Sequence, residues 1–160
     1  MDEYLEKNFA NVNMWLHFAE AKNAANIALA MAAVVGLLGL DEKNVLIYFI
    51  CIIFCCSGGA SLVSFWPNLG DVAHGGNKTS TPNLQFFEHI KNYSGKEYVE
   101  EVNKVYFRNS SQKVTQYQED LAKEIVYNAK IASRKYKLFK IAFYGDLIAF
   151  LSIILFLICA

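Results

Sequence analysis

Three apolar stretches constrain the fold of this 160-residue chain more than any other feature of its sequence. They cover 24–40, 45–66 and 141–160, and about 20 residues of helix are enough to cross the hydrocarbon core of a bilayer. The first stretch reaches that length if its helix begins near Glu20. Because nothing alternates at period two, the sequence predicts an all-α membrane protein with three transmembrane helices.

The basic residues predict how the chain is oriented. Twelve of the fifteen Lys and Arg residues lie in 67–140, between the second and third apolar stretches. Basic residues close to membrane spans stay on the cytoplasmic side, so this region and the N-terminus are predicted to be cytoplasmic. We therefore expect an amphipathic helix over 1–23, a transmembrane hairpin over 24–66, a cytosolic helical domain over 67–140 and a C-terminal transmembrane helix over 141–160.

Start signals predict three helices in the cytosolic region, after a loop that follows Pro67. Thr81 and Pro82 predict a first helix that runs to about Tyr93. Ser94 and Glu97 form a capping box for a second helix, which ends near Arg108. A third helix begins at Ser110 or Ser111 and, with no Gly or Pro before Gly145, is predicted to run into the last span.

The third cytosolic helix has two faces. An apolar rhythm of three and four residues favours burial of one face against other helices or a neighbouring subunit. The opposite side carries a basic stripe, for which phosphates of lipid headgroups or of a nucleotide are the natural partner, although a solvated surface gives the same pattern. This basic stripe consists of Lys123, Tyr127, Lys130, Arg134 and Lys137.

Polar side chains inside the predicted spans are candidates for function, since an intramembrane carboxylate costs at least about 2.5 kcal/mol without a partner. Asp146 is such a group, and we expect Lys22 or Lys140 to reach it. His17, Glu20 and Asn23 share one face of the first helix, and Ser57, Ser61 and Ser64 share one face of the second. These side chains either tie the helices together or line the mouth of a pore.

Small side chains follow one face of the first span. They include Ala28, Ala32 and Gly36, at the spacing that lets helices approach closely in lipid. The stripe of small residues is predicted to pack either against the second span or between subunits.

The remaining reactive side chains do not predict chemistry. The four cysteines, Cys51, Cys55, Cys56 and Cys159, lie within the predicted spans and are expected to be buried, inert thiols. The histidines His17, His74 and His89 are scattered, so no metal site is expected. Without a catalytic constellation, we expect neither an enzyme nor a cofactor.

Three segments resemble Pycsar-type transmembrane effectors. The first is Trp-Leu-His-Phe-Ala-Glu-Ala-Lys-Asn-Ala-Ala-Asn over 15–26, in which an acidic residue and Lys22 lead into the first span. The second is 82–99, with Asn83, Phe86, Phe87, Ile90 and the Glu97-Tyr98 pair. The third is 120–136, the helix before the last span. Together the resemblance covers most of the chain.

The resemblance implies a function. Such proteins are membrane effectors of bacterial antiphage defence, controlled by a nucleotide that a companion nucleotidyltransferase or cyclase makes. The resemblance also implies a homo-oligomer in the inner membrane, in contact with lipid, that forms an ion-conducting or depolarising pore. We expect this homo-oligomer to be a tetramer. A Hailong-type arrangement, in which an oligonucleotide holds a channel shut, is similar in plan.

A cyclic-nucleotide-binding fold does not fit the 74 residues between the spans, which read as helices. A nucleotide or oligonucleotide would therefore bind the helical region itself, with the basic stripe as the candidate site. The alternative function is a non-conducting membrane adaptor whose cytosolic helices dock a soluble partner.

Overall fold

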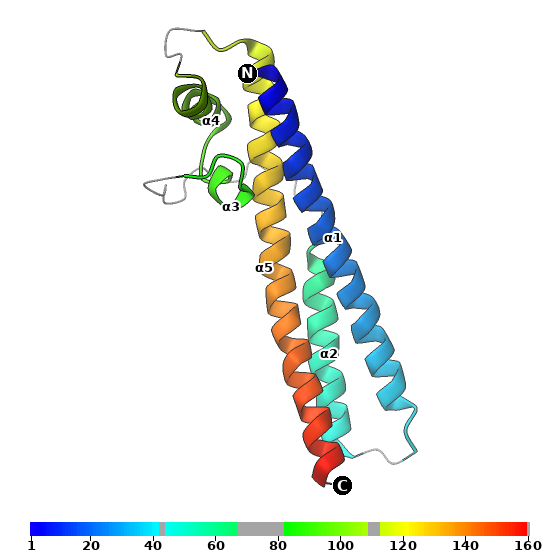
Figure 1. Cartoon of the computed structure of the whole chain (residues 1–160). Helices are drawn as coiled ribbons and strands as arrows, with labels where there is room; N and C mark the ends of the chain where they lie inside the picture. Colours follow the sequence, from blue (N-terminus) through cyan, green and yellow to red (C-terminus); the bar gives the residue numbers. More distant parts are fainter. Residues whose placement is uncertain (42–43, 67–81, 109–112, 160) are drawn as a thin grey trace. The chain divides into compact units, whose positions relative to one another are not determined.

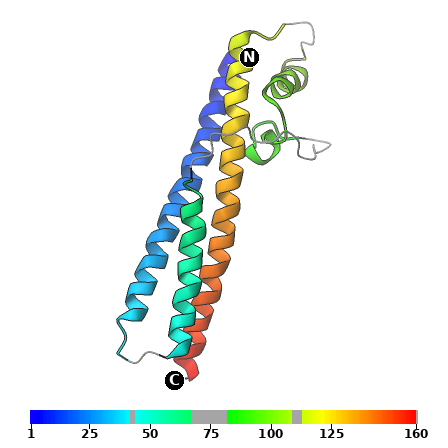
Figure 2. The same cartoon turned by 180° about the vertical axis from the view of Figure 1, so that it is seen from behind.

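A computed structural model describes residues 1–41, 44–66, 82–108 and 113–159, which form helices and no strands (Figures 1 and 2). The helices are α1 (Asp2–Leu38), α2 (Val45–Val63), α3 (Phe87–Ile90), α4 (Gly95–Val102), the π-helix η1 (Asn103–Phe107) and α5 (Gln116–Cys159). The predicted all-α class is confirmed.

Helices α1, α2 and α5 are long and apolar enough to cross a membrane, as the three apolar stretches predict. The amphipathic N-terminal helix and the first span form one continuous helix, α1. The last soluble helix and the third span likewise form one helix, α5. The predicted stop of the second span at Pro67, the loop after it and His74 lie outside the described residues.

The chain divides into two compact units. The first unit comprises 1–18 and 68–134, so the N-terminal segment folds together with the central region. The second unit comprises 19–67 and 135–160 and contains the parts of α1 and α5 that are richest in apolar residues, together with all of α2.

The second unit packs one face of α2 into its interior at steps of three and four residues. These buried positions are Ile47, Ile50, Phe54, Ser57, Ser61 and Ser64. Phe54 forms an edge-on ring contact with Phe150 of α5 at 5.6 Å between centroids. The apolar cluster of the unit combines Ile50 and Phe54 with Ala30 of α1 and Ala149 of α5.

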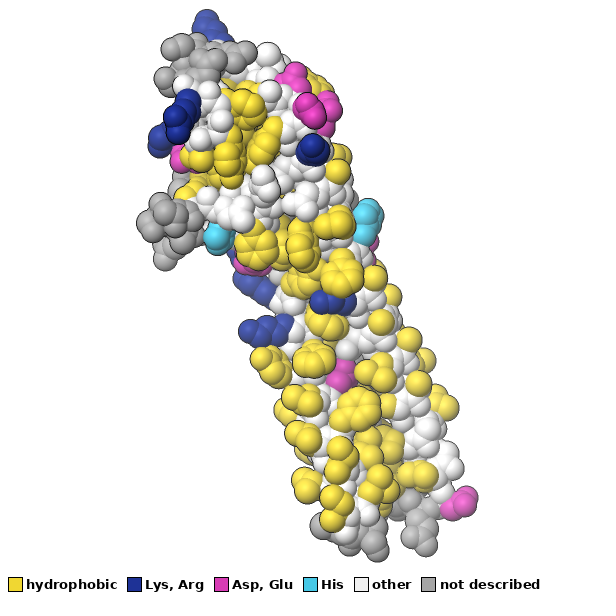
Figure 3. Space-filling model, viewed as in Figure 1, with side chains coloured by type: hydrophobic (Ala, Val, Ile, Leu, Met, Phe, Trp, Pro, Cys, Tyr) yellow, Lys and Arg dark blue, Asp and Glu magenta, His cyan; other side chains and the backbone are white. Residues whose placement is uncertain are grey.

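Large apolar side chains cover the outside of the same unit (Figure 3). They include Phe49 and Ile52 of α2 and Leu151 and Leu155 of α5, each more than half exposed. A soluble protein rarely leaves an apolar surface of this extent in water. The outside therefore suits lipid, while polar side chains gather within.

The first unit is held together by a buried hydrogen-bond network. Asn8 of α1 donates from Nδ2 to the Leu84 carbonyl at 2.9 Å and to the hydroxyl of Tyr98 on α4. The Tyr98 hydroxyl donates to the same carbonyl at 2.8 Å. Because Tyr98 is fully buried, desolvation raises the pKa of its phenol far above the ordinary value, and the group stays a neutral donor.

Helix α4 begins as the sequence predicts. The Ser94 hydroxyl accepts from the Glu97 backbone N–H, and the Glu97 carboxylate accepts from the Ser94 backbone N–H. The second helix of this region changes to a π-helix at Asn103, and Arg108 then takes a left-handed conformation with φ of 50°. A capping box at Thr115 and Gln118 starts α5 at Gln116; the predicted start at Ser110 or Ser111 lies outside the described residues.

The first predicted soluble helix, from Pro82 to Tyr93, is wrong in extent, because only Phe87–Ile90 is helical. The Asn83 side chain accepts from the Gln85 backbone N–H, and His89 Nδ1 accepts from the Asn83 backbone N–H. These local bonds offer the backbone an alternative to helical pairing. The segment consequently enters α3 through a turn.

Helix α4 approaches α5 closely at Gly95. A Cβ atom placed on Gly95 would lie 2.8 Å from Cα and 2.9 Å from N of Lys123. Only glycine fits this contact without a shift of the backbone.

We predict that Gly95→Ala destabilises the first unit by about 1–3 kcal/mol, the usual cost of overpacking. Thermal unfolding of the detergent-solubilised protein, followed by circular dichroism, measures the change. Gly59→Ala is the matched control, since nothing lies within 4 Å of a Cβ at that position. Equal melting temperatures for the two variants would contradict the close contact.

Candidate intramembrane polar site

A row of buried polar side chains runs through the interior of the second unit. At one end, Lys135 of α5 is only 8% exposed and its ammonium group lies 3.0 Å from a carboxylate oxygen of Glu20 on α1. The ammonium also lies 5.0 Å from the ring centre of Phe65, within the range of a cation–π contact. The charge of Lys135 is thus compensated inside the unit.

The next polar group along α1 is Asn23, which is fully buried. Its Nδ2 donates to the Ala19 carbonyl at 2.9 Å and to the Lys135 carbonyl at 3.2 Å, so it links α1 to α5. Its Oδ1 has no hydrogen-bond partner, and neither have the buried hydroxyls of Ser61 and Ser64 on α2. Three acceptor oxygens are therefore unsatisfied in this part of the interior.

One turn further, a hydrogen-bond chain joins all three helices. Asn26 Nδ2 of α1 donates to Ser57 Oγ of α2 at 3.0 Å, and Ser57 Oγ donates to the Ala142 carbonyl of α5 at 2.9 Å. Asp146 lies beside this chain, with Ser57 and Asn26 as its polar neighbours. It is 3% exposed, and neither of its carboxylate oxygens has a hydrogen-bond partner.

The polar groups end at the apolar cluster of Ala30, Ile50, Phe54 and Ala149, which follows the next turn of each helix. We call the polar part the polar column. It consists of Glu20, Asn23, Asn26, Ser57, Ser61, Ser64, Lys135 and Asp146. The column lies inside a unit whose outside is apolar, and such intramembrane polar groups usually serve function.

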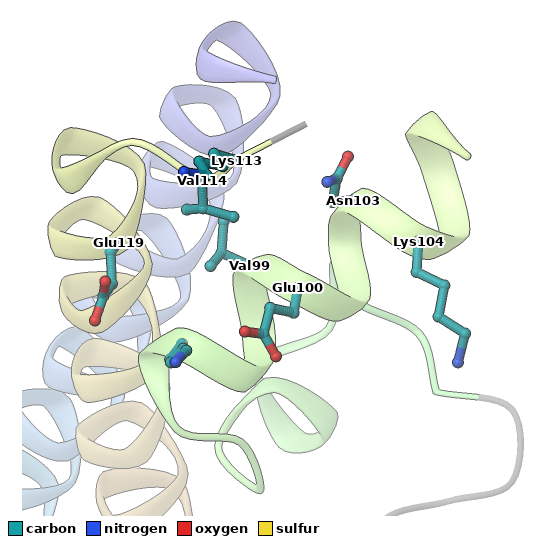
Figure 4. A pocket seen from close by; sticks show the side chains of 8 residues that line it. Val99, Glu100, Asn103, Lys104, Lys113, Val114 and Glu119 are labelled. Carbon is teal, nitrogen blue, oxygen red and sulfur yellow. The ribbon is translucent and has the colours of Figure 1, made fainter. Parts of the chain in front are cut away.

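A pocket of about 600 Å³ lies in the first unit (Figure 4). Val99 of α4 and Val114 face one another in it, and Glu119 of α5 also lines it. Three lysines and two glutamates give its lining mixed charge, and the π-helix η1 supplies part of one wall; such π-turns occur frequently at functional sites. The lining residues are Lys96, Val99, Glu100, Asn103, Lys104, Lys113, Val114 and Glu119.

The basic stripe on α5 is partly engaged within the protein. Lys123 is exposed and pairs with Asp120 at 3.1 Å and with Glu119 at 3.5 Å. Hydrogen bonds from Gln116 and from Lys123 lower the pKa of Asp120. Tyr127, Lys130 and Arg134 are half-buried, and Lys137 is exposed in the second unit.

A comparison with protein-family models identifies the chain. The model described as the Pycsar effector protein domain matches residues 4–160, which is nearly the whole sequence. This chain is a Pycsar effector. Searches of curated proteins and of solved structures gave no match.

Membership of the Pycsar family identifies the protein as a membrane effector of antiphage defence, in a system of nucleotide signalling with a companion cyclase. The resemblance noted in three segments of the sequence is confirmed over almost the full length. The polar column is thus the interior of the membrane unit of a defence effector.

The structure of this Pycsar effector brings six predicted residues into the column: Glu20, Asn23, Ser57, Ser61, Ser64 and Asp146. His17 lies elsewhere, exposed in the first unit. The predicted partners of Asp146 are wrong, since neither lysine hydrogen-bonds to it. The ammonium of Lys22 lies 5.4 Å from the ring centres of Tyr136 and Phe139, and that of Lys140 lies 6.0 Å from Tyr144.

Sequence reasoning missed Lys135 and Asn26. Lys135 follows the periodicity of α5, because Ala132, Lys135, Ala142, Asp146 and Ala149 are all buried at steps that suit one face of that helix. Asn26 follows the periodicity of α1 in the same way, since Ala19, Asn23, Asn26 and Ala30 are buried. Counting backwards from the apolar end of α5 would have placed Lys135 inside. Its charged side chain, between Arg134 and Lys137 of the basic stripe, gives no sign of burial by residue type.

Ala28, Ala32 and Gly36 are exposed on α1, while Ala30 faces the interior. Packing of these three residues between subunits stays a prediction. The expected burial of the cysteines is wrong for Cys55 and Cys56, which are exposed on α2; among the described thiols, Cys51 is buried. The stripe of small residues is therefore available to another helix.

We predict that the Glu20 and Lys135 side chains of this effector stabilise it as a pair. Lys135→Met leaves the Glu20 carboxylate without its partner, and because the Glu20 side chain is 37% exposed we expect a cost of about 1–3 kcal/mol. Adding Glu20→Met should restore part of the loss. A double-mutant cycle of thermal unfolding measures the coupling, which we expect at about 1 kcal/mol or more.

Lys137→Met is the control for this cycle, since Lys137 is an exposed lysine of the same helix. It should change the unfolding free energy by less than about 0.5 kcal/mol. Strictly additive effects of the Glu20 and Lys135 substitutions would contradict the pairing.

Proposed function

We propose that this Pycsar effector assembles as a homo-oligomer in the bacterial inner membrane and conducts ions, so that the membrane depolarises. The assembly is controlled by a nucleotide or oligonucleotide signal from a companion nucleotidyltransferase or cyclase. The N-terminus and the central region lie in the cytoplasm. The protein acts by permeation and binding rather than as an enzyme, and it uses no cofactor.

The observation that carries this proposal is the polar column. An effector that only anchored a partner in the membrane would gain nothing from an uncompensated buried carboxylate, which costs at least about 2.5 kcal/mol in a bilayer. Asp146 keeps both oxygens without hydrogen bonds, next to Ser57, whose hydroxyl accepts from Asn26 and donates to the Ala142 carbonyl. In the assembled pore, the negative charge of Asp146 would favour the passage of cations.

The stripe of small residues supports an oligomer. Ala28, Ala32 and Gly36 are exposed on a helix that is apolar enough to cross the membrane. Small side chains at this spacing allow close packing between helices of neighbouring subunits in lipid. Because three helices from one chain cannot enclose a pore, several copies are required, and a tetramer is our working stoichiometry.

Control by a nucleotide is supported by the basic groups of the first unit. Lys130 and Arg134 lie one turn apart on α5, and Lys96, Lys104 and Lys113 line the 600 Å³ pocket of the same unit. Arg and Lys bind phosphate through charge-assisted hydrogen bonds. The N-terminal segment shares this unit with the central region, which supports placing both on the cytoplasmic side.

Ion flux from proteoliposomes tests conduction, with the co-expressed signal-making enzyme or its nucleotide products as activator. We predict that Asp146→Asn lowers cation flux at least about tenfold, which corresponds to about 1.4 kcal/mol. Glu124→Gln is the control, because it removes one carboxylate from an exposed position on the same helix.

Absence of flux in the wild type together with no depolarisation of activated cells would contradict conduction. Equal flux in wild type and Asp146→Asn would contradict the role of Asp146 in conduction. A protein that inserts, captures a soluble partner and conducts nothing would instead be the membrane adaptor.

The basic stripe is tested separately by a Lys130→Glu and Arg134→Glu double variant. We predict that the variant still inserts in the membrane but responds to the nucleotide at least about tenfold less sensitively, as the loss of two phosphate contacts implies. The response is measured as flux against nucleotide concentration. Lys7→Glu, at an exposed lysine of α1 outside the stripe, should respond as the wild type does.

A further inference from the structure

Asp146 is a buried carboxyl group for which the described part of the second unit supplies no cationic partner. Lys135 is engaged by Glu20 and lies against the Phe65 ring. The ammonium groups of Lys22 and Lys140 lie over aromatic rings. Neither oxygen of Asp146 accepts a hydrogen bond. A cation or a proton from outside the chain would balance the charge of this carboxylate.

The hydroxyl of Ser57 does not solve this problem. Its proton is donated to the Ala142 carbonyl, so it is not donated to Asp146. Ser57 Oγ accepts one hydrogen bond from Asn26, which leaves its second lone pair unused. Asn26 and Ala142 thus hold the Ser57 oxygen beside the carboxylate as an acceptor or a metal ligand, and not as a donor.

Further unsatisfied oxygens lie in the column toward the Glu20 end. They are Oδ1 of Asn23 and the hydroxyl oxygens of Ser61 and Ser64, all buried and without partners. Carboxylate, amide and hydroxyl oxygens are hard ligands, which suit cations such as sodium, potassium, magnesium and calcium. A single carboxylate balances one positive charge, so a monovalent ion fits this set better than a divalent ion.

We propose that Asp146 and Ser57 bind a monovalent metal cation, sodium or potassium, inside the polar column. The cation reaches them from the end marked by Glu20 and Lys135, past Asn23 and Ser61. The apolar cluster of Ala30, Ile50, Phe54 and Ala149 closes the other side. The proposal deepens the proposed function and rests on it for the role of this ion, which is the species that the pore conducts.

The test is the thermal stability of the full-length protein in lipid nanodiscs, measured in sodium, potassium or N-methylglucamine chloride at one ionic strength. A ligand that binds only the folded state raises the melting temperature. We expect at least one metal cation to raise it by about 5 °C over N-methylglucamine at saturation. Asp146→Asn should abolish this difference, and Glu124→Gln should keep it.

Binding of radioactive sodium or rubidium, the latter standing in for potassium, to the wild-type protein gives a second measurement that needs no variant. Ser57→Ala should weaken this binding about tenfold. Equal melting temperatures in all three salts together with no isotope binding would overturn the proposal. So would a change of stability with pH that is equally large in N-methylglucamine, since a proton would then occupy the site.

This experiment separates the cation site from the pore. Cation-dependent stability without flux keeps the site and overturns conduction. Flux without cation-dependent stability or isotope binding keeps the pore and overturns the site.

Discussion

The hydroxyl group of Ser57 is the point at which hydrogen bonds from the three membrane-spanning helices meet. Helices in lipid gain no hydrophobic energy from leaving water, so close packing and polar bonds decide how they associate. Ser57 accepts from α1 and donates to α5, and this fixes which faces of the three helices turn inward. The other members of the polar column follow from that arrangement, because they share those faces.

The first unit uses the same principle. Tyr98 and Asn8 are buried and bond to each other and to the Leu84 carbonyl, which joins α1 to the segment before α3 and to α4. In both units, a buried polar group that bonds to three segments therefore determines the packing. Unsatisfied buried polar groups raise the free energy of either unit, so alternative arrangements of these helices would be less stable.

The sequence was sufficient for the helical class, the three spans, the capping box at Ser94 and the serine face of α2, because each depends on local periodicity or on a local hydrogen bond. It failed where long-range pairing decided the outcome. Lys135 follows an inward face but carries a charge, and only Glu20 and Phe65, distant in sequence, make its burial acceptable. Asn83 and His89 shortened α3 through side-chain bonds that periodicity does not encode. The orientation of the units and the ligand contacts stay predictions.

The apolar cluster around Phe54 bears on whether a lone subunit would leak ions. Under the proposed conduction, ions that entered the column from the Glu20 end would meet the packed side chains of Ala30, Ile50, Phe54 and Ala149, and a dry apolar barrier of this kind stops ions because they cannot shed their hydration there. A lone subunit would then not conduct. The effector would stay inserted without draining the proton-motive force, and its action would depend on assembly and not on synthesis.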